Sequence, residues 1–84
     1  MTPAPPVTLY TRADCPLCDE ARALLDALAA TLGFTIEAVD IDADPELRSR
    51  YNYAVPVIAV GSEEVARAPI RPAALEGSLR ERYR

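Results

Sequence analysis

The sequence predicts an α/β domain whose elements follow the order β-α-β-α-β-β-α. Apolar residues recur at helical spacing between Pro16 and Gly33, and short β-prone runs lie on both sides of this segment. A further stretch of helical periodicity follows Pro72 near the end of the chain. A strand, a helix and a strand in succession form a βαβ unit, so we expect the first two strands to run parallel.

The first three elements have clear boundaries. Residues 7–10 form a β-prone run that leads into a polar loop. The helix that follows starts at Pro16, where a missing N–H costs no hydrogen bond, and ends before Gly33, which suits a left-handed residue. Residues 35–40 alternate apolar and polar side chains and predict the second strand. The apolar stripe of the helix comprises Leu17, Ala21, Leu24, Leu25, Leu28 and Leu32.

A short helix and two strands come next. Asp44 is followed by a proline, which is typical of a helix start, and residues 47–51 complete about two turns. Residues 55–60 are apolar enough for a buried strand, and Gly61 with Ser62 supplies a turn. We expect residues 64–68 to return as an antiparallel edge strand.

The last helix begins at Pro72, and Leu75, Leu79 and Tyr83 recur in it every four residues. The arginines near its end suit the negative C-terminal end of the helix dipole. Residues 1–6 contain three prolines and are expected to form a disordered leader. The rest of the chain, residues 7–84, is expected to be a single domain with one compact core.

Composition excludes several classes of function. The formal net charge is -4, and no cluster of basic residues is visible, so nucleic acid is not an expected partner. The chain has no histidine, which excludes Ser-His-Asp and Cys-His catalysis and every metal site that needs an imidazole. No apolar run is long enough to span a membrane, and no signal peptide is recognisable. We expect a cytoplasmic monomer that does not bind a membrane.

The two cysteines lie where the first strand ends and the long helix begins. Cys15 and Cys18 have C-x-x-C spacing inside a βαβ unit, which is the context of a redox motif. Free N–H groups and the positive end of the helix dipole stabilise a thiolate, so we expect the pKa of the Cys15 thiol to be lowered. Arg12 adds a second positive influence, whereas nearby acidic residues oppose it. Cys18, one turn into the helix, suits a less exposed resolving thiol.

Three other interpretations of the pair account for the sequence less well. A structural disulfide closing so small a loop would restrict the unfolded chain only weakly. A zinc site would lack ligands, because a C-x-x-C supplies only half of a four-ligand shell, so we expect no metal within one chain. Two inert thiols would require burial, which is not typical of a helix N-terminus after a polar loop. Redox chemistry is therefore favoured.

Other residues have ordinary structural interpretations. Most X–Pro bonds in folded proteins are trans, so residue preference alone predicts a trans peptide before Pro56. The four tyrosines, Tyr10, Tyr51, Tyr53 and Tyr83, are expected in the core or at its rim.

Taken in order, Leu9-Tyr10-Thr11-Arg12, Cys15-Pro16-Leu17-Cys18 and Val55-Pro56-Val57-Ile58 resemble the glutaredoxin branch of the thioredoxin superfamily. The resemblance covers roughly residues 7–84 and implies a thioredoxin-like fold, with a four-stranded mixed sheet flanked by three helices. It implies that Cys15 attacks, that Cys18 resolves, and that the peptide bond between Val55 and Pro56 is cis. It also implies that the backbone of Val55 pairs with the substrate. By resemblance, the substrate-binding residues are Arg12, Pro16, Leu17, Val55 and Pro56.

The sequence departs from the glutaredoxin pattern in two places. Leu17 stands where glutaredoxins usually have an aromatic residue, and Ala66-Arg67 near Pro69 replaces a Gly-Gly-Asp-like segment. In glutaredoxins the glycines of that segment allow a close backbone approach to glutathione. Because this sequence lacks them, the resemblance does not imply glutathione binding.

We therefore predict a dithiol-disulfide oxidoreductase that reduces protein or small-molecule disulfides with Cys15 and Cys18. It needs no bound cofactor, but it needs an external thiol reductant, either glutathione or a reductase system. The expected partners are a disulfide-containing protein or small thiol and a reductase. Two alternatives remain: a metal or iron–sulfur module that uses the pair across a dimer, and a degenerate redoxin that serves as an interaction domain.

Overall fold

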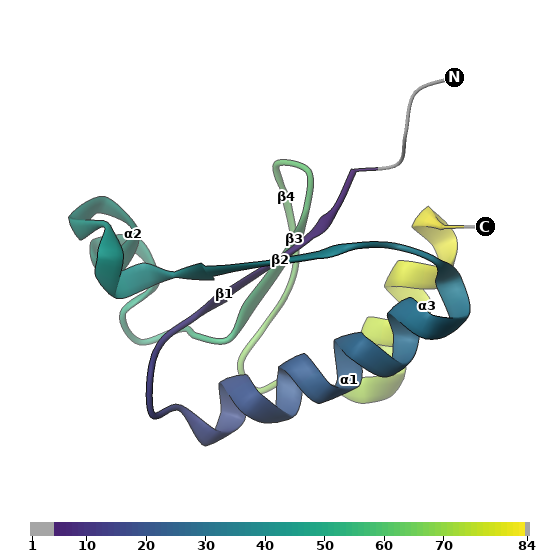
Figure 1. Cartoon of the computed structure of the whole chain (residues 1–84), viewed down its shortest axis with the longest axis horizontal. Coiled ribbons are helices and arrows are strands. Elements are labelled where there is room, and N and C mark those ends of the chain that lie inside the picture. Colours follow the sequence, from purple (N-terminus) through teal and green to yellow (C-terminus); the bar gives the residue numbers. More distant parts are fainter. Residues whose placement is uncertain (1–4, 84) are drawn as a thin grey trace.

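The computed structural model describes residues 5–83, and its elements follow the predicted order. Three helices surround a central sheet, as Figure 1 shows. The elements are β1 (Val7–Thr11), α1 (Pro16–Leu32), β2 (Ile36–Asp40), a 3₁₀ turn (Ile41–Ala43), α2 (Pro45–Tyr51), β3 (Val57–Val60), β4 (Glu63–Arg67) and α3 (Pro72–Arg82).

The sheet is four-stranded and mixed, in the order β2-β1-β3-β4. β1 and β2 pair in parallel, as a βαβ unit requires, and β3 pairs antiparallel with both β1 and β4. The β3–β4 pairing contains a register shift between Ile58 and Ala59. The predicted thioredoxin-like architecture of a mixed sheet with three helices is confirmed.

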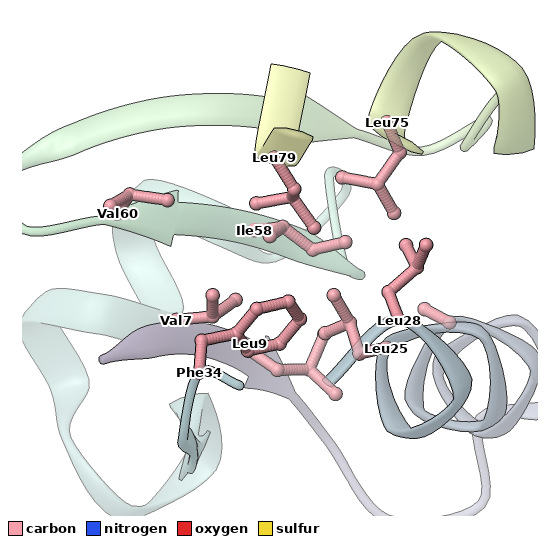
Figure 2. Packing of buried hydrophobic residues seen from close by; sticks show 10 residues of the cluster. Val7, Leu9, Leu25, Leu28, Phe34, Ile58, Val60, Leu75 and Leu79 are labelled. Carbon is pink, nitrogen blue, oxygen red and sulfur yellow. The ribbon is translucent and has the colours of Figure 1, made fainter. Parts of the chain in front are cut away.

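One face of the sheet carries the main core. Side chains of a strand alternate between its two faces, so Val7 and Leu9 of β1 point to the same side. They pack with Leu25 of α1 and with Leu75 and Leu79 of α3 (Figure 2). The amphipathic stripe predicted for α1 thus packs on the sheet beside α3, and it fixes the position of the helix whose first turn contains the cysteines. The prediction is wrong for Leu17, which lies in the first turn of α1, beyond the core, and is 55% exposed.

The opposite face of the sheet carries a smaller cluster. Ile41 and Tyr51 pack there with Val57 of β3, and Tyr10 lies against them. The rings of Tyr10 and Tyr51 are 4.7 Å apart between centroids. Tyr53 lies outside both clusters and is 98% exposed, so the expectation that every tyrosine lies in the core or at its rim is wrong for this residue.

Both predicted ends of α1 are confirmed. Pro16 is the first helical residue, and Gly33 follows the helix with φ of 83°, a left-handed conformation that glycine adopts without steric cost. The Gly33 N–H donates to the carbonyl oxygen of Ala29 at 2.8 Å. Asp44 caps α2 through its side chain, which accepts a hydrogen bond from the Glu46 N–H at 2.9 Å.

The strand predicted over residues 55–60 is shorter in the structure, because β3 begins at Val57. Pro56 has no N–H to give to a strand partner, and its carbonyl oxygen accepts a hydrogen bond from Ala68 at 3.0 Å. The edge strand predicted over residues 64–68 is observed over Glu63–Arg67.

The two ends of the described chain meet. The hydroxyl of Tyr83 donates to the carbonyl oxygen of Pro5 at 2.6 Å. Residues 1–4 of the predicted leader lie outside the described residues. Within residues 5–83, no helix has both the length and the apolar character needed to cross a membrane.

Candidate redox site

The cysteines occupy the junction between β1 and α1. Cys15 is the N-cap residue of α1, and Cys18 lies one turn later in the helix. The two residues form a disulfide, with their Cα atoms 5.2 Å apart. Cys18 is 1% exposed, whereas Cys15 is half-buried and in contact with solvent. The predicted placement of both residues is therefore confirmed, and Cys18 is the less exposed of the two. Their roles as attacking and resolving thiols stay a prediction.

Backbone hydrogen bonds organise the first turn of α1 around Cys15. Its sulfur accepts a hydrogen bond from the Cys18 N–H at 3.2 Å, and its carbonyl oxygen accepts one from the Asp19 N–H at 3.1 Å. After reduction, the same Cys18 N–H is placed to stabilise a thiolate on Cys15, and the helix dipole acts in the same direction. Asp14, directly before Cys15, adopts φ of 55°, so the chain turns sharply into the helix.

The acidic residues near Cys15 are solvated. Asp14, Asp19 and Glu20 are all exposed, and water and salt screen exposed charges strongly. Their opposition to a thiolate is therefore smaller than that of buried carboxylates at similar distances.

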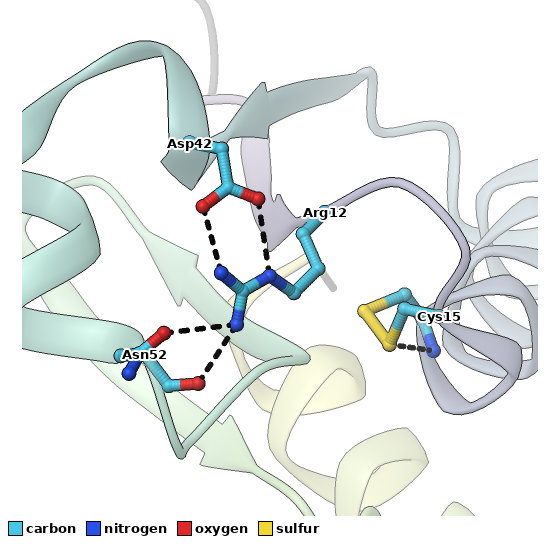
Figure 3. The surroundings of a disulfide bond; sticks show 5 residues. Arg12, Cys15, Asp42 and Asn52 are labelled. Atoms are coloured by element: carbon cyan, nitrogen blue, oxygen red, sulfur yellow. Dashed lines mark hydrogen bonds and ion pairs between the residues drawn. A yellow bond between two sulfur atoms is a disulfide. The ribbon is translucent and has the colours of Figure 1, made fainter.

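Arg12 points away from the disulfide, as Figure 3 shows. Its guanidinium donates to both carboxylate oxygens of Asp42, at 3.1 and 2.7 Å, and to the backbone and side-chain oxygens of Asn52, both at 3.0 Å. The hydrogen bond from Arg12 lowers the pKa of Asp42, and the bond to Asp42 raises the pKa of Arg12. The sequence led us to expect a positive influence of Arg12 on Cys15, and the ion pair reduces this influence, because Asp42 offsets the charge of Arg12.

Arg12 instead links three segments of the chain. It follows β1 directly, Asp42 lies in the 3₁₀ turn after β2, and Asn52 directly follows α2. The interaction holds the start of the cysteine loop against the carboxyl end of the neighbouring strand. Sequence reasoning missed both partners, which are 30 and 40 residues from Arg12 along the chain.

The Val55–Pro56 peptide is cis. The expectation from residue preference is therefore wrong, and the one from the resemblance is confirmed. The Val55 N–H donates to the carbonyl oxygen of Tyr51 at 3.3 Å, so it already has a partner. To pair with a substrate, this N–H must first release the carbonyl oxygen of Tyr51. The substrate-binding role of Val55 stays a prediction.

A groove of about 390 Å³ opens beside the pair, and we call it the Leu17 groove. Leu17, Ala21 and Leu24 of α1 line one side of it, and Pro56, Pro69 and Ile70 line the other. Glu20 is the charged residue in the lining.

The Leu17 groove brings together only part of the predicted substrate-binding set. Leu17 and Pro56 line it, and Arg12 is held elsewhere by Asp42 and Asn52. Sequence reasoning missed Glu20 and Ile70 as lining residues. The proline-rich segment before α3 was the available signal for Ile70, and the Ala68–Pro69 peptide within it is also cis. Among the described residues, no three cysteine or acidic side chains gather as metal ligands.

Residues 6–80 match the family described as "Glutaredoxin-like domain (DUF836)". The chain belongs to this glutaredoxin-like family. Among solved structures, a structural-genomics target protein from X. campestris shares 33% sequence identity and a TM-score of 0.76, over 89% of this chain and 96% of that one. A protein from Nitrosomonas europaea shares 26% identity and a TM-score of 0.77, over 93% and 94% of the two chains.

The fold of this chain is also similar to that of thioredoxins. A mutant thioredoxin from Halobacterium salinarum superposes with a TM-score of 0.70 over 93% of this chain and 74% of its own, at 18% identity. At that identity the likeness concerns the fold alone. It confirms the thioredoxin-like architecture described above.

Proposed function

We propose that this glutaredoxin-like protein is a dithiol-disulfide oxidoreductase. The Cys15 thiolate attacks one sulfur of a substrate disulfide, and the other substrate sulfur leaves as a thiolate. Cys18 then loses its proton and attacks the Cys15 sulfur, which releases the second substrate thiol and forms the Cys15–Cys18 disulfide. Two electrons pass from the protein dithiol to the substrate, and the two protons lost by the cysteines balance those gained by the products.

The arrangement of the first turn of α1 is the main support for this proposal. Cys15 and Cys18 are close enough to form a disulfide, so the resolving step is intramolecular and fast. Cys15 contacts solvent at a helix N-terminus, whereas Cys18 is shielded, so an incoming disulfide reaches Cys15 first. The membership of the chain in the glutaredoxin-like family agrees with this chemistry.

The cycle requires a thiol reductant from outside the protein. We propose no bound cofactor, because the two thiols carry the electrons themselves. The reductant returns the Cys15–Cys18 disulfide to the dithiol, and the candidates are glutathione and a flavoprotein reductase. The substrate is a disulfide in a protein or in a small thiol compound.

Two serine variants test the proposal, and they make the same chemical change three residues apart. Cys15→Ser is expected to abolish reduction of a model disulfide, such as hydroxyethyl disulfide, because no attacking thiol remains. Cys18→Ser is expected to accumulate a mixed disulfide on Cys15, measured as a mass increase that dithiothreitol reverses. Equal activity of Cys15→Ser and the wild type would refute the proposal.

The electron donor is identified in the same assay. Reduction by glutathione with glutathione reductase is compared with reduction by NADPH with thioredoxin reductase. We expect turnover in the second system, since the segment 66–67 lacks the glycines that allow close approach of glutathione.

A further inference from the structure

We propose that the protein acts on polypeptide disulfides whose reactive cysteine has an apolar and a basic neighbour. The Leu17 groove takes the apolar side chain, and Glu20 pairs with the basic one. This inference rests on the proposed oxidoreductase function and names its substrate class.

The position of the Leu17 groove connects it to the redox pair. Leu17 lies between Cys15 and Cys18 in the chain, and Pro56 on the other side directly follows Val55. A chain segment whose cysteine reaches Cys15 therefore lies at the mouth of the groove. Its volume of about 390 Å³ accommodates an aliphatic side chain with adjoining backbone.

Exposed apolar side chains favour a polypeptide over a small thiol compound. Among the described residues, the large hydrophobic side chains that remain exposed are Leu17 at 55% and Tyr53 at 98%. One lies within the C-x-x-C motif, and the other lies two residues before Val55. Both segments adjoin the predicted substrate site. Exposed apolar side chains at such a place are typical of a surface that another chain covers.

The charge of the groove favours a cationic ligand. Glu20 lines it, is exposed and forms no ion pair with the described residues. Asp19 adds a second exposed carboxylate on the same turn of α1. Arg71 lines a neighbouring hollow rather than this groove, and Arg12 is paired with Asp42. Glutathione carries two carboxylates, and the lining of the groove offers them no cationic side chain, whereas an arginine or lysine side chain complements Glu20.

A thiol-exchange equilibrium measures this preference. Cys18→Ser protein is first glutathionylated on Cys15, and a cysteine peptide is then added. The peptide thiol takes the place of glutathione on the Cys15 sulfur, glutathione is released as a thiol, and no net oxidation occurs. Intact-protein mass spectrometry gives the equilibrium constant. The same exchange on oxidised glutathione, without protein, corrects for the intrinsic reactivity of each peptide thiol.

Four capped pentapeptides separate the apolar from the charge contribution. Their central cysteine is flanked by two leucines or two serines, and their ends are two arginines or two glutamates. The leucine peptides are expected to have a corrected exchange equilibrium constant about tenfold higher than the serine peptides, because one leucine side chain is partly buried in the groove. Arginine is expected to raise it about threefold over glutamate, as an exposed ion pair provides. The leucine–arginine peptide is expected to exceed glutathione.

Two further variants in the Cys18→Ser background locate the preference. Leu17→Ser is expected to remove most of the leucine effect, and Glu20→Gln is expected to remove the arginine effect. Glu37→Gln, a change of an exposed carboxylate on β2, is the matched control and is expected to retain both effects.

The outcomes distinguish this inference from the function on which it rests. If Cys15 exchanges thiols but the corrected constants of all four peptides and glutathione agree within about twofold, the inference is overturned and the redox function stands. A preference for glutathione or for the glutamate peptides has the same consequence. If Cys15 forms no mixed disulfide with any thiol, both the redox function and the substrate class are refuted.

Discussion

The difference in accessibility between the two cysteines predicts a large difference in alkylation rate. In the reduced protein, iodoacetamide reaches Cys15 directly but reaches Cys18 only after the first turn of α1 opens. That opening breaks two hydrogen bonds, from the Cys18 N–H to the Cys15 sulfur and from the Asp19 N–H to the Cys15 carbonyl, worth about 1 kcal/mol each. It also exposes the Cys18 side chain, which costs about 1 kcal/mol.

Together these contributions hold the turn closed by about 3 kcal/mol, which corresponds to alkylation of Cys18 about a hundredfold slower than that of Cys15. The rate of Cys15 is measured on Cys18→Ser and that of Cys18 on Cys15→Ser, in which the serine hydroxyl oxygen replaces the sulfur as acceptor of the Cys18 N–H. Both rates are obtained by quenched mass spectrometry. In concentrated guanidinium chloride the two rates are expected to agree within about threefold, because unfolding removes the protection. Equal rates in the folded variants would refute the division of roles drawn from burial.

Two further predictions concern stability. Leu25→Ala is expected to lower the free energy of unfolding by about 2–5 kcal/mol, because Leu25 is fully buried in the core between α1 and the sheet; urea denaturation measures this, and a loss under about 1 kcal/mol would contradict the packing described. Asp42→Asn is expected to flatten the acid side of the stability profile. The hydrogen bond from Arg12 lowers the pKa of Asp42, so the folded protein binds fewer protons at this site, and the stabilisation present above about pH 4 is lost as the pH falls through the lowered pKa. Urea midpoints from about pH 6 to about pH 3 test this, with Glu37→Gln as the control; an unchanged wild-type profile in Asp42→Asn would contradict it.

The fold was predictable because its boundaries depend on local chemistry. The limits of α1 follow from Pro16 and Gly33, and the start of α2 follows from Asp44, each through an interaction within a few residues. β1 contributes side chains to both hydrophobic clusters, because successive residues of a strand point to opposite faces of the sheet. Leu9 therefore lies in one cluster and Tyr10 against the other. These features require no knowledge of distant contacts.

The site was predictable in part. Cys15 and Cys18 are three residues apart, so their proximity at the start of α1 could be predicted from the chain alone. The cis peptide before Pro56 could not be predicted from residue preference, because only about 5–6% of X–Pro bonds are cis and tertiary contacts select them. It was predicted from the resemblance to glutaredoxins. The engagement of Arg12 with Asp42 also depends on how β1 and β2 are aligned, which the sequence does not show at either residue.

The two outer strands of the sheet have a consequence for behaviour at high concentration. β2 and β4 each leave one row of backbone groups unpaired, and such rows can recruit strands from other molecules into aggregates. The exposed carboxylates Glu37 and Asp40 lie on β2 and form no ion pair with the described residues. On β4, Glu63 and Glu64 are paired with Arg82 and Arg67, and the register shift in the β3–β4 pair makes this edge irregular. If two copies met through their β2 edges, like charges would face each other, so the carboxylates of β2 oppose fibrillar stacking of the sheet at this edge.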